Sequence, residues 1–244
     1  MRFSVLLTIG LLTGAANPAE AQSVPVGIVA DPCIAKLTPD QDWPNLCRYR
    51  ADNATVAARP QHDRAVVFMG DSITRGWDLE HSPALGTGMI NRGISGQTTP
   101  QMLARFMADV VALHPRAVHI MAGTNDLAGN TGPETEQDVK NNIVAMATLA
   151  RANHIRVILA SIPPARAFPW RPEVKPLAEL HALNAWLRDY AKRTGAIYVD
   201  YGPALAAPDG GMRAEFSADG VHPDAAGYAA MAPVTKKAIA AALR

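Results

Sequence analysis

From residue 65 onward, the chain carries continuous apolar segments that are separated by patterns typical of helices. These segments are residues 65–69, 117–122, 155–161 and 196–200, and a weaker one lies near residues 89–90. Apolar segments without polar alternation are typical of strands that are buried on both faces. Because strands alternate with helices throughout, the sequence predicts an α/β fold with a parallel sheet between two layers of helices.

The helix signals between these strands are caps and stops. They are the pair Thr99-Pro100, the capping-box sequence from Thr135 to Asp138, the stop at Gly195, and a last helix from about Asp224 with an expected kink at Pro233. Threonine before proline, and threonine followed three residues later by an acidic residue, are both typical of helix starts. Each predicted helix therefore lies between two predicted strands or after the last one.

Length and charge limit the classes of function. The 244 residues, 48% of them hydrophobic, suit one compact domain with a short extension. The 23 basic and 22 acidic residues give a formal net charge of +1 and are spread along the chain. Nucleic acid and anionic membrane surfaces are therefore not expected as partners, and a small neutral substrate fits better.

The N-terminus has the pattern of a secretory signal peptide. Arg2 precedes the apolar residues 3–12, and Ala19-Glu20-Ala21 forms a cleavage site before Gln22. This cleavage pattern predicts a signal peptide over residues 1–21 and export to the periplasm or the extracellular space. The alternative is a hydrophobic N-terminal helix that is retained. No other segment is apolar enough to span a membrane, so no integral span is expected in the mature chain.

Residues 22–60 are interpreted as an N-terminal extension, and residues 61–244 as the main domain. The extension holds both cysteines, Cys33 and Cys47. An isolated pair in an exported protein usually forms a disulfide, and two free thiols are the alternative. A helix broken by Pro44 is expected between Asp40 and Asn53.

Polar residues follow the predicted strands where the strands end. The four stretches are Gly70-Asp71-Ser72, Asn91 to Gly96, Gly123-Thr124-Asn125-Asp126 and, before the last helix, Asp219 to Pro223. Ligands of parallel sheets bind beyond the carboxyl ends of the strands. The four stretches are therefore expected to meet around one site.

Each stretch contains a residue that could take part in catalysis, and each such residue could instead have an ordinary structural role. Ser72 can act as a nucleophile if a base takes its proton, or it can cap a helix. Asp219 can hold His222 in one tautomer, or both can belong to a surface loop. A backbone N–H at Gly93 and the amide of Asn125 can stabilise an oxyanion, or both can be turn residues.

Other reactive patterns are weaker. Among the remaining histidines, His119 lies in a predicted strand and is interpreted as a core residue. The chain contains no H-E-x-x-H sequence, no Cys/His cluster and no calcium loop, so no metal or cofactor is expected. Ser72 also lacks the G-x-S-x-G elbow of the common α/β-hydrolases.

Taken together and in this order, the four stretches resemble the motif blocks of the SGNH (GDSL) hydrolase superfamily, over about residues 65–240. The resemblance implies a three-layer, flavodoxin-like α/β/α sandwich with about five parallel strands. It implies Ser72 as nucleophile, His222 as base and Asp219 as the residue that orients it. The implied oxyanion hole consists of the Ser72 and Gly93 N–H groups and the Asn125 side chain, with no cofactor.

The resemblance implies a carboxylic ester hydrolase but does not specify the ester. Export and near-neutral charge favour acetyl or other short-chain esters of saccharides or small alcohols. Lysophospholipids, thioesters, acyl transfer and a non-catalytic binding protein are the alternatives. Trp170, in the loop of residues 163–175, and Asp71 are the candidate substrate contacts, although Trp170 can instead anchor its loop.

Overall fold

The central sheet has five parallel strands, as predicted. In the computed structural model, which describes residues 27–34, 36–79, 82 and 84–244, the sheet order is β2-β1-β3-β4-β5. The strands are β1 (Val66–Gly70), β2 (Met89–Gly93), β3 (Ala117–Met121), β4 (Arg156–Ala160) and β5 (Ile197–Val199). β2 is an edge strand, and β1, which precedes Ser72, lies between β2 and β3. The carboxyl ends of these three strands are therefore neighbours.

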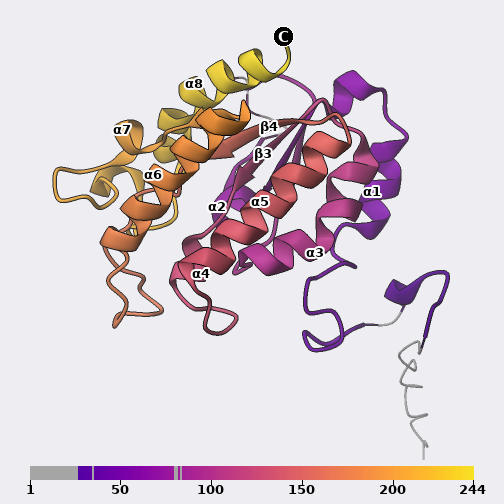
Figure 1. Cartoon of the computed structure of the whole chain (residues 1–244), viewed down its shortest axis with the longest axis horizontal. Coiled ribbons are helices and arrows are strands. Elements are labelled where there is room, and N and C mark those ends of the chain that lie inside the picture. Colours follow the sequence, from indigo (N-terminus) through magenta and orange to yellow (C-terminus); the bar gives the residue numbers. More distant parts are fainter. Residues whose placement is uncertain (1–26, 35, 80–81, 83) are drawn as a thin grey trace, which may run out of the picture.

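Helices cover both faces of the sheet (Figure 1). They are α1 (Arg50–Ala57), α2 (Ser72–Gly76), α3 (Thr99–Asp109), α4 (Thr124–Leu127), α5 (Glu136–Ala152), α6 (Leu177–Thr194), α7 (Gly202–Leu205) and α8 (Ala225–Ala242). One apolar core joins α1, α3, α5 and α6 to the sheet, and a second core joins α2, α7 and α8 to its other face. The three-layer α/β/α prediction is confirmed.

The helix ends follow the sequence signals closely. Thr135 and Asp138 form the predicted capping box at the start of α5, and Asp224 accepts a hydrogen bond from the N–H of Gly227 at the start of α8. Gly195 ends α6 with a left-handed φ of 71°. The cap of α3 is Thr98, one residue before the predicted one, because its side chain and that of Gln101 form a capping box.

The extension packs against the edge of the sheet and carries the predicted disulfide. Cys33 and Cys47 are bonded, with their Cα atoms 5.4 Å apart. The prediction of a helix between Asp40 and Asn53 is wrong in its start: residues 38–48 form turns and the helix begins at Arg50. The Asp42 carboxylate explains the turns, since it accepts backbone N–H groups of residues 46 and 47 that a longer helix would have used.

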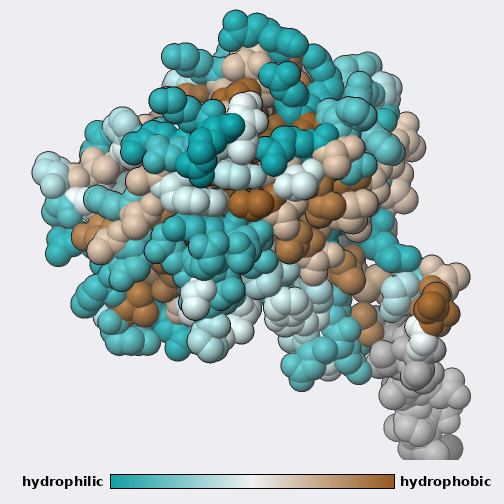
Figure 2. Space-filling view, in the orientation of Figure 1, coloured by the Kyte–Doolittle hydropathy of each residue, from teal (hydrophilic) through white to brown (hydrophobic). Residues whose placement is uncertain are grey.

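The predicted signal peptide, residues 1–21, lies outside the described residues. Within the described part of the chain, no helix combines the length and the hydrophobicity needed to cross a membrane. Hydrophobic side chains in the view of Figure 2 are scattered among polar ones. The large exposed hydrophobic residues are concentrated in the extension, which contributes Ile28, Ile34, Trp43 and Leu46.

A fully buried arginine in α3 ties the ends of β1 and β2 together. The Nη2 atom of Arg105 donates to the backbone oxygens of Gly70, at 3.2 Å, and Arg92, at 2.8 Å. Its Nε donates to the side chain of Gln97 at 2.6 Å, and Nη1 pairs with the equally buried Asp109 at 2.8 Å. One guanidinium therefore fixes the turn before Ser72 and the loop after β2 relative to each other.

We expect Arg105→Met to lower the free energy of unfolding by about 3–5 kcal/mol, because it leaves the Asp109 carboxylate buried without its cation. Urea denaturation followed by circular dichroism measures this loss. Arg188→Met is the control, since Arg188 forms an exposed pair with Asp189 at 4.0 Å and its loss should leave stability nearly unchanged. Equal stability of the two variants would show that Arg105 is not the main tie.

Candidate active site

Ser72 stands where β1 turns into α2. The strand ends at Gly70, and Asp71 caps the helix because its Oδ1 accepts the N–H of Ile73 at 2.9 Å. Ser72 is therefore the first helical residue, and its own N–H meets no acceptor in the described part of the chain. The capping role that the sequence left open for Ser72 belongs to Asp71, so the serine hydroxyl is available for other contacts.

The hydroxyl of Ser72, the imidazole of His222 and the carboxylate of Asp219 form a continuous hydrogen-bonded line. Ser72 Oγ lies 2.9 Å from His222 Nε2, and His222 Nδ1 lies 2.7 Å from Asp219 Oδ2. The serine and the histidine are 150 residues apart in sequence. A carboxylate can only accept, so it places the imidazole proton on Nδ1 and leaves the Nε2 lone pair facing the hydroxyl.

Asp219 is held in place by its own turn. Its Oδ1 accepts the backbone N–H groups of Val221 and His222 and the hydroxyl of Ser217, at 2.8–3.1 Å. Partial burial alone would raise the pKa of Asp219, but the hydrogen bonds from His222 and Val221 outweigh burial and lower the pKa to about 2. The carboxylate therefore stays ionised over the neutral pH range.

Asn125 lies in α4, the short helix that follows β3, and its buried side chain is directed toward Asp71 after β1. Its Nδ2 donates to the backbone oxygen of Gln97 at 3.1 Å and, over a longer 3.3 Å, to Asp71 Oδ2. Burial raises the pKa of Asp71 to about 6, although the Ile73 N–H and the charge of His222 lower it. The predicted amide donor is therefore on the same side of the sheet as Ser72.

Gly93 does not join this cluster. The N–H of Ile94 donates to Gly70 on β1, so the N–H of the preceding Gly93 points away from β1, where it donates to Asn91 Oδ1 at 2.9 Å. Gly93 is required for another reason: a Cβ there would lie 2.2 Å from the backbone nitrogen of Arg75. The glycine lets β2 approach the turn that carries Ser72.

The same stretch contains a second glycine that the sequence interpretation missed. Gly96 has left the strand, has a left-handed φ of 79°, and its N–H has no acceptor among the described residues. Its neighbour Gln97 contacts Asn125, and its other neighbour Ser95 accepts a hydrogen bond from Arg75 in α2. Gly96 therefore lies between the serine turn and Asn125, with open space beside its Cα. Its position after the end of β2 is the signal that could have identified it.

Trp170 borders the site from the loop that follows β4. Its ring stacks on Phe168 with centroids 5.3 Å apart and lies 5.9 Å from the ring of His222. The indole is 39% exposed, and its Nε1 donates to the side chain of Asn130 at 3.0 Å. The structure thus ties Trp170 to the protein and leaves part of its surface free.

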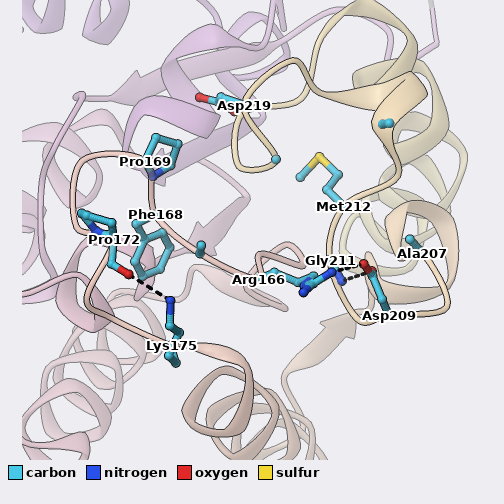
Figure 3. Close-up of a pocket in the computed structure, with 13 residues that line it drawn as sticks. Arg166, Phe168, Pro169, Pro172, Lys175, Ala207, Asp209, Gly211, Met212 and Asp219 are labelled. Atoms are coloured by element: carbon cyan, nitrogen blue, oxygen red, sulfur yellow. Dashed lines mark hydrogen bonds and ion pairs between the residues drawn. The ribbon is translucent and has the colours of Figure 1, made fainter.

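A cavity of about 510 Å³ adjoins the Asp219 turn (Figure 3). Phe168 and Pro169 lie on one side of it and Met212 on the other, with Asp219 at its edge. Arg166, also in its lining, reaches Asp209 at 2.5 Å, so this charge is paired. Its lining includes Asp219 and Gly220 but neither Ser72 nor His222, so the cavity lies beside the turn that holds Asp219.

His119, which the sequence predicts to be a core residue, lies in the core. His119 is buried in β3 and its Nε2 lies 2.9 Å from the hydroxyl of Tyr201, and burial lowers its pKa to about 3. It is therefore a neutral core residue at physiological pH. Among the described residues, no group of three or more His, Cys, Asp or Glu side chains is arranged to hold a metal ion.

The sequence profile of the GDSL-like lipase/acylhydrolase family matches residues 68–230. The chain belongs to this family. The matched range holds all four strand-end stretches, so family membership and the geometry of the site agree. Membership supports a general activity as a carboxylic ester hydrolase.

Solved structures of this family superimpose well on the chain. A GDSL-like lipase from Bacteroides thetaiotaomicron is 43% identical, with a TM-score of 0.77, and the alignment covers 82% of this chain and 99% of that one. A Bacteroides fragilis protein described as an acylhydrolase is 42% identical, with a TM-score of 0.77 over 83% of this chain and 99% of that one.

Curated relatives match over shorter stretches. Lipoprotein YqeF of Bacillus subtilis is 33% identical over 117 residues, which are 41% of this chain and 48% of YqeF. An acetylxylan esterase of Geobacillus stearothermophilus is 47% identical over 45 residues, 18% of this chain and 20% of the esterase. The chain therefore matches half or less of the length of these two proteins.

We expect Asp71 to make the wild type less stable as pH rises. Its folded-state pKa of about 6 is above the ordinary 3.8, so the native state binds this proton more tightly than the unfolded state. Its contribution to stability is full below pH 4 and is lost between pH 4 and 6, by at most about 1.4 kcal/mol per pH unit.

Asp71→Asn removes this titration, because asparagine also caps helices but carries no proton to release. The difference in unfolding free energy between variant and wild type, from urea denaturation at pH 4, 5, 6 and 7, should shift in favour of the variant as pH rises. A difference that stays constant over this range would contradict the raised pKa.

Proposed function

We propose that this GDSL-family chain is a serine ester hydrolase that works through an acyl-enzyme. The observation that carries the proposal is the hydrogen-bonded line from Ser72 through His222 to Asp219, with spacings of 2.9 and 2.7 Å. A serine hydroxyl is a weak nucleophile until a neighbouring base takes its proton, and this arrangement supplies that base in the correct tautomer.

In the first step, Ser72 Oγ attacks the ester carbonyl carbon while His222 Nε2 takes the hydroxyl proton. The carbonyl oxygen becomes an oxyanion, and His222 then gives its proton to the leaving alcohol as the carbon–oxygen bond breaks. In the second step, water attacks the acyl-enzyme, His222 takes a proton from the water, and the acid leaves as Ser72 recovers its proton. Asp219 stays ionised throughout and stabilises the imidazolium.

The oxyanion hole that we propose differs from the sequence expectation in one member. Its donors are the N–H of Ser72, the N–H of Gly96 and the Nδ2 of Asn125. Gly96 replaces Gly93 because the Gly93 N–H is engaged with Asn91, whereas the Gly96 N–H has no acceptor in the described structure. Such donors stabilise the developing oxyanion best when they are already oriented toward it before the reaction begins.

We infer a short-chain ester of a saccharide or a small alcohol as substrate. His222 protonates the leaving alcohol, and the cavity of about 510 Å³ lies on the side of Asp219, so it is the place for the alcohol. Next to the proposed oxyanion donors, the side chains of Asp71, Gln97 and Asn125 are polar and almost completely buried, so they offer a long acyl chain no apolar surface. Similarity to an acetylxylan esterase over 45 residues agrees with this choice.

Export of the protein is part of the same proposal. The bonded pair Cys33 and Cys47 fits an oxidising compartment, and the similarity to a lipoprotein of Bacillus subtilis points the same way. The signal peptide over residues 1–21 and its cleavage before Gln22 remain predictions, and mass spectrometry of the mature N-terminus tests them.

A fluorophosphonate probe should label the wild type at a single serine. Such probes phosphonylate a serine only when a base activates it. Ser72→Ala should abolish both the labelling and the esterase activity, whereas Ser82→Ala, at a serine in the turn before β2, should keep both. Peptide mass spectrometry identifies the labelled residue, and p-nitrophenyl acetate reports activity. Ester hydrolysis that survives in Ser72→Ala would refute the acyl-enzyme mechanism.

We expect kcat/KM to fall at least tenfold from p-nitrophenyl acetate to the decanoate ester, because the polar oxyanion side does not accept a long chain. Release of acetate from acetylated xylan, measured beside lysophospholipid hydrolysis, tests the alcohol. A preference for long chains or for lysophospholipid would favour a lipid hydrolase. Binding of these esters without turnover would favour the non-catalytic alternative.

A further inference from the structure

The side chain of Asn130 bridges the proposed oxyanion donor and the loop of residues 163–175. Its Nδ2 donates to Asn125 Oδ1 at 2.7 Å, and its Oδ1 accepts the indole N–H of Trp170 at 3.0 Å. The backbone N–H of Asn130 also donates to the backbone oxygen of Asn125 at 3.0 Å. A chain of hydrogen bonds therefore runs from Trp170 through Asn130 and Asn125 to Asp71 and Gln97.

The two ends of this chain fix its direction. The indole N–H of Trp170 can only donate, and the backbone oxygen of Gln97 and an ionised Asp71 can only accept. Both amides between these ends are therefore forced into one orientation. Asn125 must direct its oxygen to Asn130 and the two hydrogens of its NH₂ group toward Gln97 and Asp71, the side on which we place the oxyanion, which would take over the longer, 3.3 Å bond to Asp71. A flipped Asn125 would direct an oxygen at the developing negative charge.

We propose that Asn130, held by Trp170, is a positioning residue that keeps the amide of Asn125 in its donating orientation. The proposal rests on the function proposed above, since it concerns the oxyanion donor of that site. Trp170 also lies 5.9 Å from the ring of His222, so the same side chain borders the base and determines the direction of the donor chain. Trp170 therefore acts by orienting the side chain of Asn130 and does not stack on a substrate.

A double-mutant cycle with Asn125→Ala tests the proposal, because a residue that acts only through Asn125 has no effect once that amide is gone. In the wild-type background, Asn130→Leu should lower kcat for p-nitrophenyl acetate about tenfold, and Trp170→Phe about threefold, with KM within twofold. The loss is smaller than the 10²–10³ expected for Asn125→Ala, because the donor is misoriented rather than removed. In the Asn125→Ala background, both substitutions should change kcat less than twofold.

Matched controls separate positioning from general effects. Trp186→Phe alters a tryptophan that stacks on Tyr190 in α6, and Asn153→Leu removes an asparagine whose amide bonds to Leu149 at the end of α5. Both should leave kcat and KM unchanged. In ¹⁵N-labelled protein, the side-chain NH₂ signals of Asn125, assigned by their loss in Asn125→Ala, should shift or broaden in Asn130→Leu and stay in place in Asn153→Leu.

Three outcomes would overturn the proposal. They are equal losses of kcat in the two backgrounds, a rise in KM in place of the fall in kcat, and unchanged Asn125 signals in Asn130→Leu. A rise in KM for Trp170→Phe that persists without Asn125 would make Trp170 a substrate contact. Each of these results leaves the serine mechanism intact as long as Ser72→Ala is inactive, whereas esterase activity in Ser72→Ala would refute the function itself.

Discussion

The buried guanidinium of Arg105 is the interaction on which the site depends. It binds the last residue of β1, the neighbouring strand β2 and the side chain of Gln97, and Asp109 balances its charge. Parallel strands present their carboxyl ends at one edge, but they do not by themselves set the distance between the loops that follow. Arg105 sets the distance between the loops after β1 and β2, because its N–H donors form a planar group with fixed geometry.

Most polar groups of the proposed site already have hydrogen-bond partners within the protein. Asp219 is occupied by its own turn and by His222, and Asn125 is occupied on both its oxygen and its nitrogen. Asn125 is buried and cannot reorient cheaply, since each alternative orientation leaves a donor or an acceptor unpaired. Within the proposed oxyanion site, the N–H groups of Ser72 and Gly96 have no acceptor among the described residues, and the Asn125 amide has only a long, 3.3 Å bond to Asp71 to exchange.

The strand-and-helix order, the disulfide pair and the residues of the hydroxyl–imidazole–carboxylate line could be predicted from sequence, because periodicity, caps and motif blocks are local signals. The choice between Gly93 and Gly96 as the proposed oxyanion donor needed the structure, although the position of Gly96 after the end of β2 is a local signal. The N–H of Gly93 donates to Asn91 Oδ1, whereas the N–H of Gly96 has no acceptor among the described residues. Asn130 carries no motif, and its proposed role depends on its contacts with Asn125 and with Trp170, which is 40 residues away in sequence.

The sequence by itself determined which elements form and which chemical groups stand at the ends of the strands. The apolar segments fix the strands, and residues such as Asp71, Thr135 and Gly195 fix the helix ends, because these preferences act over a few residues. The tertiary structure alone decided which groups meet and which way they point. Ser72 and His222, 150 residues apart, come within 2.9 Å because the sheet brings distant loops to one edge. The direction of the Gly93 N–H, away from β1, follows from the pairing of β2 with β1, which is a long-range property of the fold.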